Sequence, residues 1–163
     1  MNVGFFRHGP AVARGTEGVA ESDRPLTPEG RKKTVQAARG LRALGLGIDA
    51  VYTSPLPRAL QTAEIVAGVL QLAAPTVLDG LSPSGSPRRL LAGLRELDSE
   101  SPLLVGHEPL LSSAVMLAIS GAAAGAIELK KAGLAVVEME SAAARPRGML
   151  KLLLSGSALR KLG

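Results

Sequence analysis

Short apolar runs alternate along this chain with longer amphipathic segments. Runs of this length, bounded by turn residues, are typical of strands. Strands are predicted at 3–6, 50–53, 76–78, 102–105, 134–139 and 149–154. The last two are predicted to pair as a hairpin at the edge of a sheet, and the polar stretch that joins them contains Arg145, Pro146 and Arg147.

The amphipathic segments predict helices at about 28–44, 57–70, 86–97 and 109–120. The first has a clear start, since Thr27 is a capping residue, Pro28 suits the first helical position and Glu29 faces the positive end of the helix dipole. Residues 9–26 show no period and are predicted to be a loop. Residues 156–163 are expected to fray as a short basic tail.

Strands that alternate with helices predict a three-layer α/β/α sandwich with a mostly parallel central sheet and an antiparallel edge hairpin. The length of 163 residues fits a single domain over 1–163. A composition that is 46% hydrophobic excludes a disordered tail. No apolar run reaches the length of a membrane span and the N-terminus lacks the features of a secretory signal, so a cytoplasmic protein is expected.

Charge and composition narrow the possible ligands. The chain has no cysteine and only two histidines, which argues against a Cys-ligated or His-rich metal site, and neither a metal nor a cofactor is expected. The net charge of +5 is compatible with binding nucleic acid, an anionic membrane surface or a phosphorylated substrate, or with solubility alone. An aromatic content of 2% lacks the stacking platforms of single-strand binding, so no nucleic-acid partner is expected. Because no apolar run is long enough to span a bilayer, no membrane partner is expected either.

Candidate chemistry lies where the predicted strands end, because open α/β sheets bind ligands beyond the carboxyl ends of their strands. Both histidines occupy such positions: His8 follows the first strand together with Arg7 and Gly9, and His107 follows the strand at 102–105. Arg58 comes soon after the strand at 50–53. Each residue alone also has a structural explanation, as a hydrogen-bonded histidine, a solvated arginine or a helix cap, but together they form a more specific pattern.

This set of side chains suits a phosphoryl group. Arginine presents paired donors that match phosphate oxygens, and a neutral imidazole is a competent nucleophile. Gly9 would let the backbone approach the ring or the phosphate closely. A second imidazole, with an ordinary pKa of about 6.5, can carry positive charge beside a dianion, because the anion raises its pKa.

Four segments carry a resemblance to the histidine phosphatase (phosphoglycerate-mutase-like) superfamily. Arg7-His8-Gly9 resembles its RHG motif, and Val105–Pro109 its second-histidine motif. Leu26–Gly30 is similar to its L-T-x-x-G helix start, and Thr53–Ala63 to its S-P-x-x-R-A-x-Q-T-A segment. The run Arg24–Thr27, the short loop Leu81–Gly85 and the compact length resemble the SixA-type phosphohistidine phosphatase branch.

The resemblance implies a phosphoglycerate-mutase-like fold and a metal-independent phosphatase. It implies that His8 is the nucleophile and forms a phosphoenzyme, and that Arg7, Arg58 and His107 bind the phosphoryl oxygens. Many superfamily members place a Glu after the third strand as proton donor, whereas this chain has Asp79 there.

Asp79 and Glu108 are weak candidates for that proton donor, and each also fits a turn or capping role. The absence of a strong acid favours a phosphoramidate substrate, whose imidazole leaving group needs less help than an alkoxide.

Three functions remain open at this stage. The leading interpretation is a phosphatase for phosphohistidine, with a histidine-phosphorylated protein as the expected partner. The alternatives are a small-molecule phosphomonoesterase of the same superfamily and a non-catalytic module that binds phosphate or phosphoproteins. Among the charged residues of the 9–26 loop, only Arg24 is expected to do more than keep the loop solvated. The sequence does not determine the oligomeric state or the physiological substrate.

Overall fold

The computed structural model describes residues 1–140 and 148–163, and these contain one sheet of six strands in the order β3-β2-β4-β1-β5-β6. The strands are β1 (Asn2–Arg7), β2 (Ala50–Thr53), β3 (Thr76–Val77), β4 (Pro102–Gly106), β5 (Leu134–Met139) and β6 (Gly148–Leu154). The predicted hairpin connection with Arg145, Pro146 and Arg147 lies outside the described residues.

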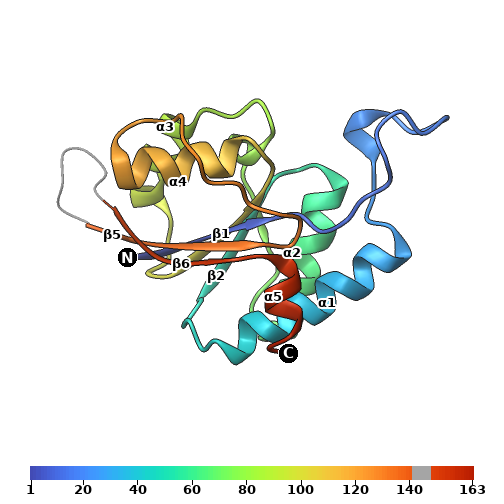
Figure 1. The fold of residues 1–163 in the computed structure, drawn as a ribbon, viewed down its shortest axis with the longest axis horizontal. Helices are drawn as coiled ribbons and strands as arrows, with labels where there is room; N and C mark the ends of the chain where they lie inside the picture. Colours follow the sequence, from blue (N-terminus) through green and yellow to red (C-terminus); the bar gives the residue numbers. More distant parts are fainter. Residues whose placement is uncertain (141–147) are drawn as a thin grey trace.

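Strand direction follows the prediction. Strands β3, β2, β4 and β1 run parallel to one another, while β5 is antiparallel to β1 and β6 is antiparallel to β5. The two antiparallel strands form one edge of the sheet, as the long arrows of β5 and β6 show in Figure 1. The mostly parallel sheet with an antiparallel edge hairpin is therefore confirmed.

Helices cover both faces of the sheet. The helices on one face are α1 (Pro28–Ala43), α2 (Pro57–Leu70) and α5 (Gly156–Arg160), and those on the other are α3 (Pro87–Gly93) and α4 (Leu110–Ser120) (Figure 1). Three short 3₁₀ helices join them: η1 (Glu21–Asp23), η2 (Asp79–Leu81) and η3 (Leu94–Glu96). No helix in the described part of the chain combines the length and hydropathy that a membrane crossing requires.

The start of α1 is the one that the sequence predicts. The Oγ1 atom of Thr27 accepts a hydrogen bond from the backbone N–H of Gly30 at 2.9 Å, and Pro28 occupies the first helical position. The predicted helix at 86–97 is shorter than expected, because α3 ends at Gly93 and the chain continues as η3. Glycine is a poor helix former, which weakens the helix at this position.

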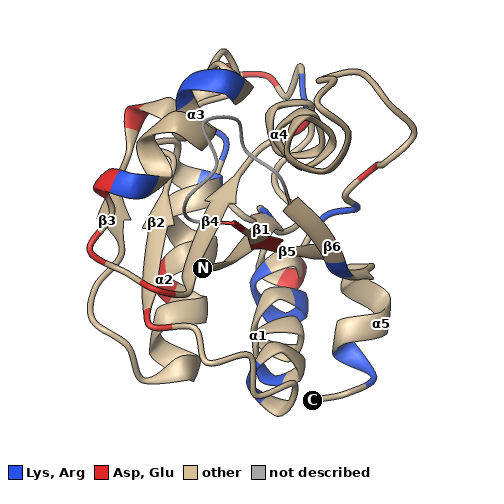
Figure 2. Cartoon of the chain, turned by 90° about the vertical axis from the view of Figure 1, so that its left-hand side faces the viewer, with Lys and Arg blue, Asp and Glu red and all other residues tan. Residues whose placement is uncertain are grey.

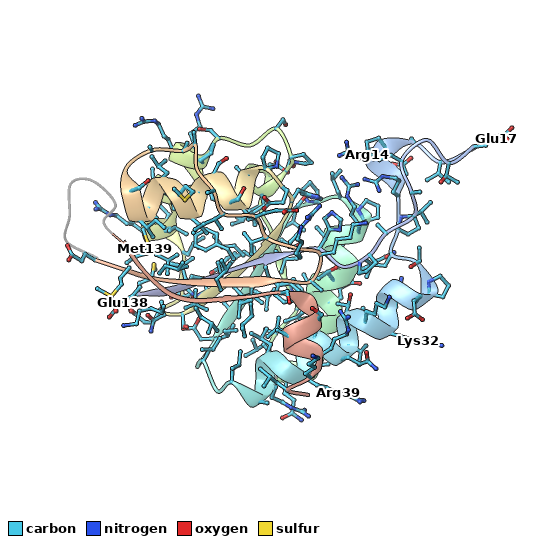
Figure 3. The ribbon with its side chains drawn as sticks, viewed as in Figure 1. Arg14, Glu17, Lys32, Arg39, Glu138 and Met139 are labelled. Carbon is cyan, nitrogen blue, oxygen red and sulfur yellow. The ribbon has the colours of Figure 1, made fainter. Side chains whose placement is uncertain are left out.

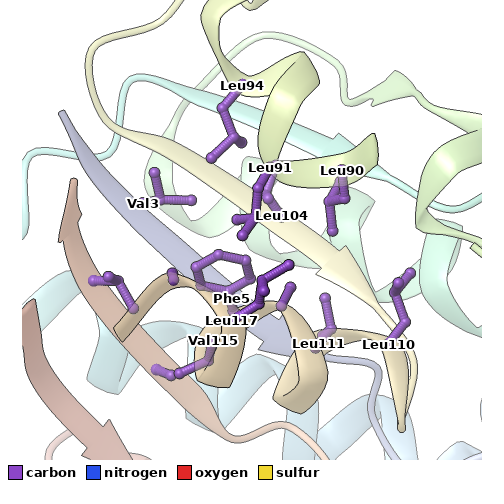
Figure 4. Packing of buried hydrophobic residues seen from close by; sticks show 14 of the residues in the cluster. Val3, Phe5, Leu90, Leu91, Leu94, Leu104, Leu110, Leu111, Val115 and Leu117 are labelled. Atoms are coloured by element: carbon purple, nitrogen blue, oxygen red, sulfur yellow. The ribbon is translucent and has the colours of Figure 1, made fainter. Parts of the chain in front are cut away.

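The core has two halves, one on each face of the sheet. Neighbouring side chains on a strand point to opposite faces, so Phe5 and Phe6 enter different clusters. Phe5 packs with Leu104 and Leu111 in the cluster under α3 and α4 (Figure 4), whereas Phe6 packs with Val105 in the cluster under α1 and α2. Because β1 and β4 are buried on both faces, their sequences are apolar without alternation.

The expectation that residues 156–163 fray is wrong. They begin with α5, whose N-terminus is capped by Ser155: its Oγ accepts from the backbone N–H of Ala158 at 3.2 Å. The Leu159 side chain is fully buried against α1. Gly40 makes this packing possible, since a Cβ atom at that position would collide with the carbonyl oxygen of Leu159. The tail is held by packing that its short, basic sequence does not reveal.

We expect Leu159→Ala to lower the free energy of unfolding by about 2–5 kcal/mol, because it removes a buried side chain and leaves a cavity between α5 and α1. Leu162, three residues further on, is 49% exposed, and Leu162→Ala should change the same quantity by less than about 0.5 kcal/mol. Urea unfolding of the two variants measures the difference. Equal, small effects would mean that α5 does not belong to the core.

Candidate active site

Three parallel strands bring the predicted site residues to one edge of the sheet. β1 and β4 are neighbours with Arg7 opposite Gly106, so the next residues, His8 and His107, leave the sheet side by side. Their ring centroids lie 5.1 Å apart with the planes tilted by 54°. β2 lies on the other side of β4, and Ser54 follows it with its Oγ atom 2.9 Å from Nε2 of His107. This edge is where the strand-end argument places the chemistry.

The ring of His8 is held in one orientation. Its Nδ1 atom lies 2.7 Å from the carbonyl oxygen of Gly9, and because a carbonyl only accepts, Nδ1 carries the proton. In the neutral ring the lone pair is then on Nε2. A Cβ atom at Gly9 would collide with Oγ1 of Thr34 on α1, so packing against a helix side chain also favours glycine at this position. The N–H of Gly9 donates to Oγ1 of Thr62 at 3.0 Å.

Both imidazoles are neutral at physiological pH. Burial, followed by the charges of Arg58, Arg7 and Lys131, lowers the pKa of His8 to about 3, although the Gly9 carbonyl opposes this. Burial also lowers the pKa of His107 to about 3, with further contributions from His8 and the nearby arginines. The second imidazole is thus neutral in the protein alone, and the positive charge expected on it is one that depends on a bound dianion. A bound dianion favours the protonated ring and raises this pKa again.

Two arginines lie at the same site and each retains an unpaired nitrogen. Arg7 donates from Nη1 to the carbonyl oxygen of Leu129 at 2.8 Å. Arg58, which is 1% exposed, donates from Nη1 to the carbonyl oxygen of Glu21 at 3.0 Å. Nε of Arg7, Nε of Arg58 and Nδ1 of His107 are buried without a hydrogen-bond partner among the described residues. Such groups cost about 1–3 kcal/mol each when unpaired, and an oxyanion supplies the acceptors that they lack.

Sequence reasoning missed the role of Glu21 in the loop after His8. Its carboxylate lies 2.7 Å from Nη2 of Arg24, 3.5 Å from Nη2 of Arg58 and 3.5 Å from Nε of Arg14. The hydrogen bond from Arg24 is the main reason that the pKa of Glu21 is lowered. Arg14 and Glu17 lie on the part of this loop that projects from the body of the protein (Figure 3). Glu21 therefore ties the loop to a buried site arginine.

A second missed segment lies just before β5. The N–H of Ala132 lies 3.1 Å from the carbonyl oxygen of Arg7 and 3.2 Å from that of His8. The carbonyl oxygen of Gly133 accepts from the backbone N–H of Arg7, and the carbonyl oxygen of Leu129 accepts from the Arg7 side chain. In the sequence this segment has no periodic pattern and no site-like motif. In the structure Ala132 has a positive φ of 55°, which is unusual for a residue other than glycine.

The two proposed proton donors are placed differently. Asp79 begins η2 and is exposed, and its carbonyl oxygen accepts from the N–H of Ser82 in a turn. Glu108 is half-buried, and its Oε1 atom accepts from the N–H of Ser112 in the first turn of α4. That contact is the capping role considered for Glu108. Among the described residues, no hydrogen bond joins either carboxylate to His8, whose Nδ1 faces Gly9. No group of three potential metal ligands gathers at one place in the same part of the chain.

The lowered histidine pKa values predict a loss of stability in mild acid. The unfolded chain binds protons below about pH 6.5, whereas the folded protein does so only near pH 3, so unfolding is favoured as the pH falls through this window. At pH 5 the loss is roughly 2 kcal/mol for each histidine. Urea unfolding between pH 7 and about 4.5 measures it, and His107→Gln should make the dependence shallower. An unfolding free energy that stays flat in the native protein would contradict these pKa values.

Comparison with known proteins places this geometry in a family. A model of the histidine phosphatase superfamily (branch 1) matches residues 3–83. The chain is 39% identical over 148 residues to an uncharacterized protein of Picosynechococcus sp., covering 89% of this chain and 88% of that protein. It is 35% identical over 115 residues to the phosphohistidine phosphatase SixA of Escherichia coli, covering 68% of this chain and 70% of that protein.

The fold agrees with these sequence relatives. The structure of the protein histidine phosphatase SixA complexed with tungstate superposes with a TM-score of 0.85 at 28% identity, covering 98% of this chain and 99% of the other. The superposition extends beyond residue 83, where the family model ends, and so includes the strand that carries His107. The chain belongs to the histidine phosphatase superfamily and is a phosphatase of the SixA-like type.

Proposed function

We propose that this phosphatase hydrolyses phosphohistidine through a covalent phospho-His8 intermediate. Two observations together carry the proposal. His8 is neutral, with its Nδ1 proton directed at the Gly9 carbonyl, and Arg7, Arg58 and His107 each have a buried nitrogen with no hydrogen-bond partner in the described part of the chain. One side chain offers a lone pair, and three offer hydrogen bonds. This is the combination that phosphoryl transfer to nitrogen needs.

In the first step the Nε2 lone pair of His8 attacks phosphorus, and the bond between phosphorus and the substrate's imidazole nitrogen breaks. The phosphoryl group is transferred to Nε2, whose ring keeps its Nδ1 proton, and the leaving imidazole takes up one proton from solvent, which the second step returns. Arg7, Arg58 and His107 donate to the three phosphoryl oxygens as charge spreads over them. The charge of the anion raises the pKa of His107, so that its ring binds as an imidazolium.

In the second step a water molecule attacks phosphorus and the bond to Nε2 of His8 breaks. Inorganic phosphate leaves and the water's proton is released, which restores the neutral ring of His8. The two guanidinium groups remain charged throughout and supply the positive charge that both steps need, so the scheme is independent of a metal.

The surroundings of the site favour a nitrogen leaving group. A free imidazole has a pKa of about 6.5 and leaves without a strong acid, whereas an alkoxide needs one. Asp79 is exposed, and Glu108 is engaged with the N–H of Ser112. Neither carboxylate is held in the way that a dedicated acid would be, although each stays a candidate proton donor.

The relatives support the same substrate class. SixA of Escherichia coli is described as a phosphohistidine phosphatase, and a SixA structure holds tungstate, a tetrahedral oxyanion like phosphate. We infer that the physiological substrate of this chain is a histidine-phosphorylated protein. A small-molecule phosphomonoesterase is the alternative within the same superfamily.

Turnover of a phosphohistidine peptide, compared with a panel of phosphate esters of sugars, nucleosides and serine, tests the proposal. We expect kcat/KM for the peptide to exceed that for the best ester by about tenfold or more, since only the ester needs a strong acid. A preference for one of the esters would replace the proposal with the phosphomonoesterase alternative. Phosphate binding without any turnover would indicate a non-catalytic module.

A further inference from the structure

A basic cavity adjoins the candidate active site and is not explained by the reaction. It has a volume of about 410 Å³ and is bordered by the end of β1, α1, the segment before β5, and α5. Five of its lining residues are basic, and none of those described is acidic. The basic residues are Arg7, Lys33, Lys130, Lys131 and Arg160. Figure 2 shows Lys and Arg positions on α1 and α5, which lie side by side on one face of the sheet.

The positive charge of the cavity is only partly neutralised. Lys33 lies 3.6 Å from Glu29 and Lys130 lies 2.6 Å from Glu128, and both pairs are at the exposed rim. Exposed pairs of this kind are weak, at about 0–1 kcal/mol, so these lysines can exchange partners. No acidic side chain of the described residues pairs with Lys131, Arg160 or Arg7. The cavity therefore holds a net positive charge.

The cavity and the reaction centre share one residue, Arg7. Arg7 lines the cavity and also lies beside His8, and the charge of Lys131 contributes to the lowered pKa of the His8 ring. A single ligand could therefore place its phosphoryl group at His8 and a second anionic group in the cavity. The basic residues of the cavity come from four segments far apart in the sequence, so only the folded protein presents them together.

We propose that this basic cavity docks the acidic side chains that flank the phosphohistidine of a protein substrate. The inference rests on the proposed function and adds the chemistry of the partner. The side chains of Lys33 and Lys130 are 40% and 64% exposed, which makes them flexible point charges suited to carboxylates at variable positions. A second phosphate of a small substrate would instead be expected to meet buried, fixed donors such as those around His8. Opposite charges on the two surfaces would speed their encounter at low salt.

Two phosphohistidine peptides of equal length serve as probes. One carries Asp and Glu around the phosphohistidine, and the other carries Asn and Gln at the same places. For the native protein at about 0.01 M ionic strength, we expect kcat/KM to be about tenfold higher for the acidic peptide. At about 1 M the two values should converge, because salt screens the interaction.

The variant that tests the surface is the double substitution Lys33→Glu with Arg160→Glu, which lies on α1 and α5 and leaves the site residues intact. It should raise KM for the acidic peptide about tenfold at low salt and change kcat/KM for the amide peptide by less than about twofold. The matched control is Arg39→Glu with Arg42→Glu. These exposed residues lie in the later part of α1, outside the cavity lining, and change the net charge equally. The control should behave like the native protein.

The outcomes separate the two proposals. If the native protein hydrolyses both peptides equally at low salt, the docking inference is overturned and the proposed function stands. If it hydrolyses neither peptide, the proposed function fails and the docking inference fails with it. If kcat/KM falls for both peptides in the Lys33→Glu/Arg160→Glu variant, the cavity binds the phosphoryl group itself. If kcat/KM falls equally in the control variant, the effect is one of net charge alone. Either result overturns the docking surface.

Discussion

His8→Ala is expected to lower kcat/KM for a phosphohistidine peptide by roughly 10⁴-fold or more, and to abolish the phosphoenzyme. In the native protein Nε2 of His8 bears the lone pair, because Nδ1 donates to the Gly9 carbonyl, and the pKa of about 3 keeps the ring neutral. Alanine removes the only atom proposed to bond to phosphorus. Any remaining rate comes from water attacking a substrate that Arg7, Arg58 and His107 still hold.

Trapping with a radiolabelled phosphoramidate measures the intermediate directly. The native protein should retain label after denaturation in alkali and lose it in acid, as a phosphorus–nitrogen bond does, whereas His8→Ala should retain none. Binding of inorganic phosphate to the variant is the control for folding, since the three anion-binding side chains are unchanged. Equal labelling of the two proteins would move the nucleophile elsewhere and end the proposed mechanism.

The sequence predicted the convergence of the site because the strand-end rule acts through topology. Once β1 and β4 are parallel neighbours, His8 and His107 must emerge together, although they lie 99 positions apart in the chain (107 minus 8). The rule needs only the strand limits and their direction. It therefore placed Arg7, His8 and His107 without any knowledge of side-chain contacts.

The residues that the sequence did not reveal act through contacts that have no local pattern. Glu21 pairs with Arg58 across 37 positions, and the segment before β5 reaches the end of β1 through the N–H of Ala132. A loop carboxylate looks the same in a sequence whether solvent or a buried guanidinium surrounds it. Leu159 was missed for a related reason, because the space that it fills is created by Gly40 in α1, a helix that is far away in the sequence.

The charge state of His107 also required the structure. Its ordinary pKa allows either form near neutral pH, and only the burial at the sheet edge decides for the neutral ring in the protein alone. The expected imidazolium therefore belongs to the complex with an anion. The sequence already linked protonation of His107 to a bound dianion, and the structure adds that burial keeps the ring neutral before the anion binds.

Arg58→Lys is expected to lower kcat by about 10²–10³-fold, the usual effect of losing one donor to a charged transition state. Lysine keeps the charge, but its single ammonium cannot reproduce the fork of the guanidinium. In that fork Nη1 donates to the carbonyl oxygen of Glu21, while the buried Nε has no acceptor among residues 1–140 and 148–163. The charge alone already has a partner in the Glu21 carboxylate, 3.5 Å away. We therefore attribute the function of Arg58 to the direction of its N–H groups.

Steady-state kinetics of the variant on the phosphohistidine peptide test this, with Arg42→Lys as the control. Arg42 is exposed on α1, and its substitution should change kcat by less than about twofold. Because Arg58 is 1% exposed, its replacement also disturbs packing, so urea unfolding must show that the variant is folded in the assay. A folded Arg58→Lys protein with native kcat and a raised KM would mean that Arg58 contributes charge to substrate binding and no directed hydrogen bond to the transition state.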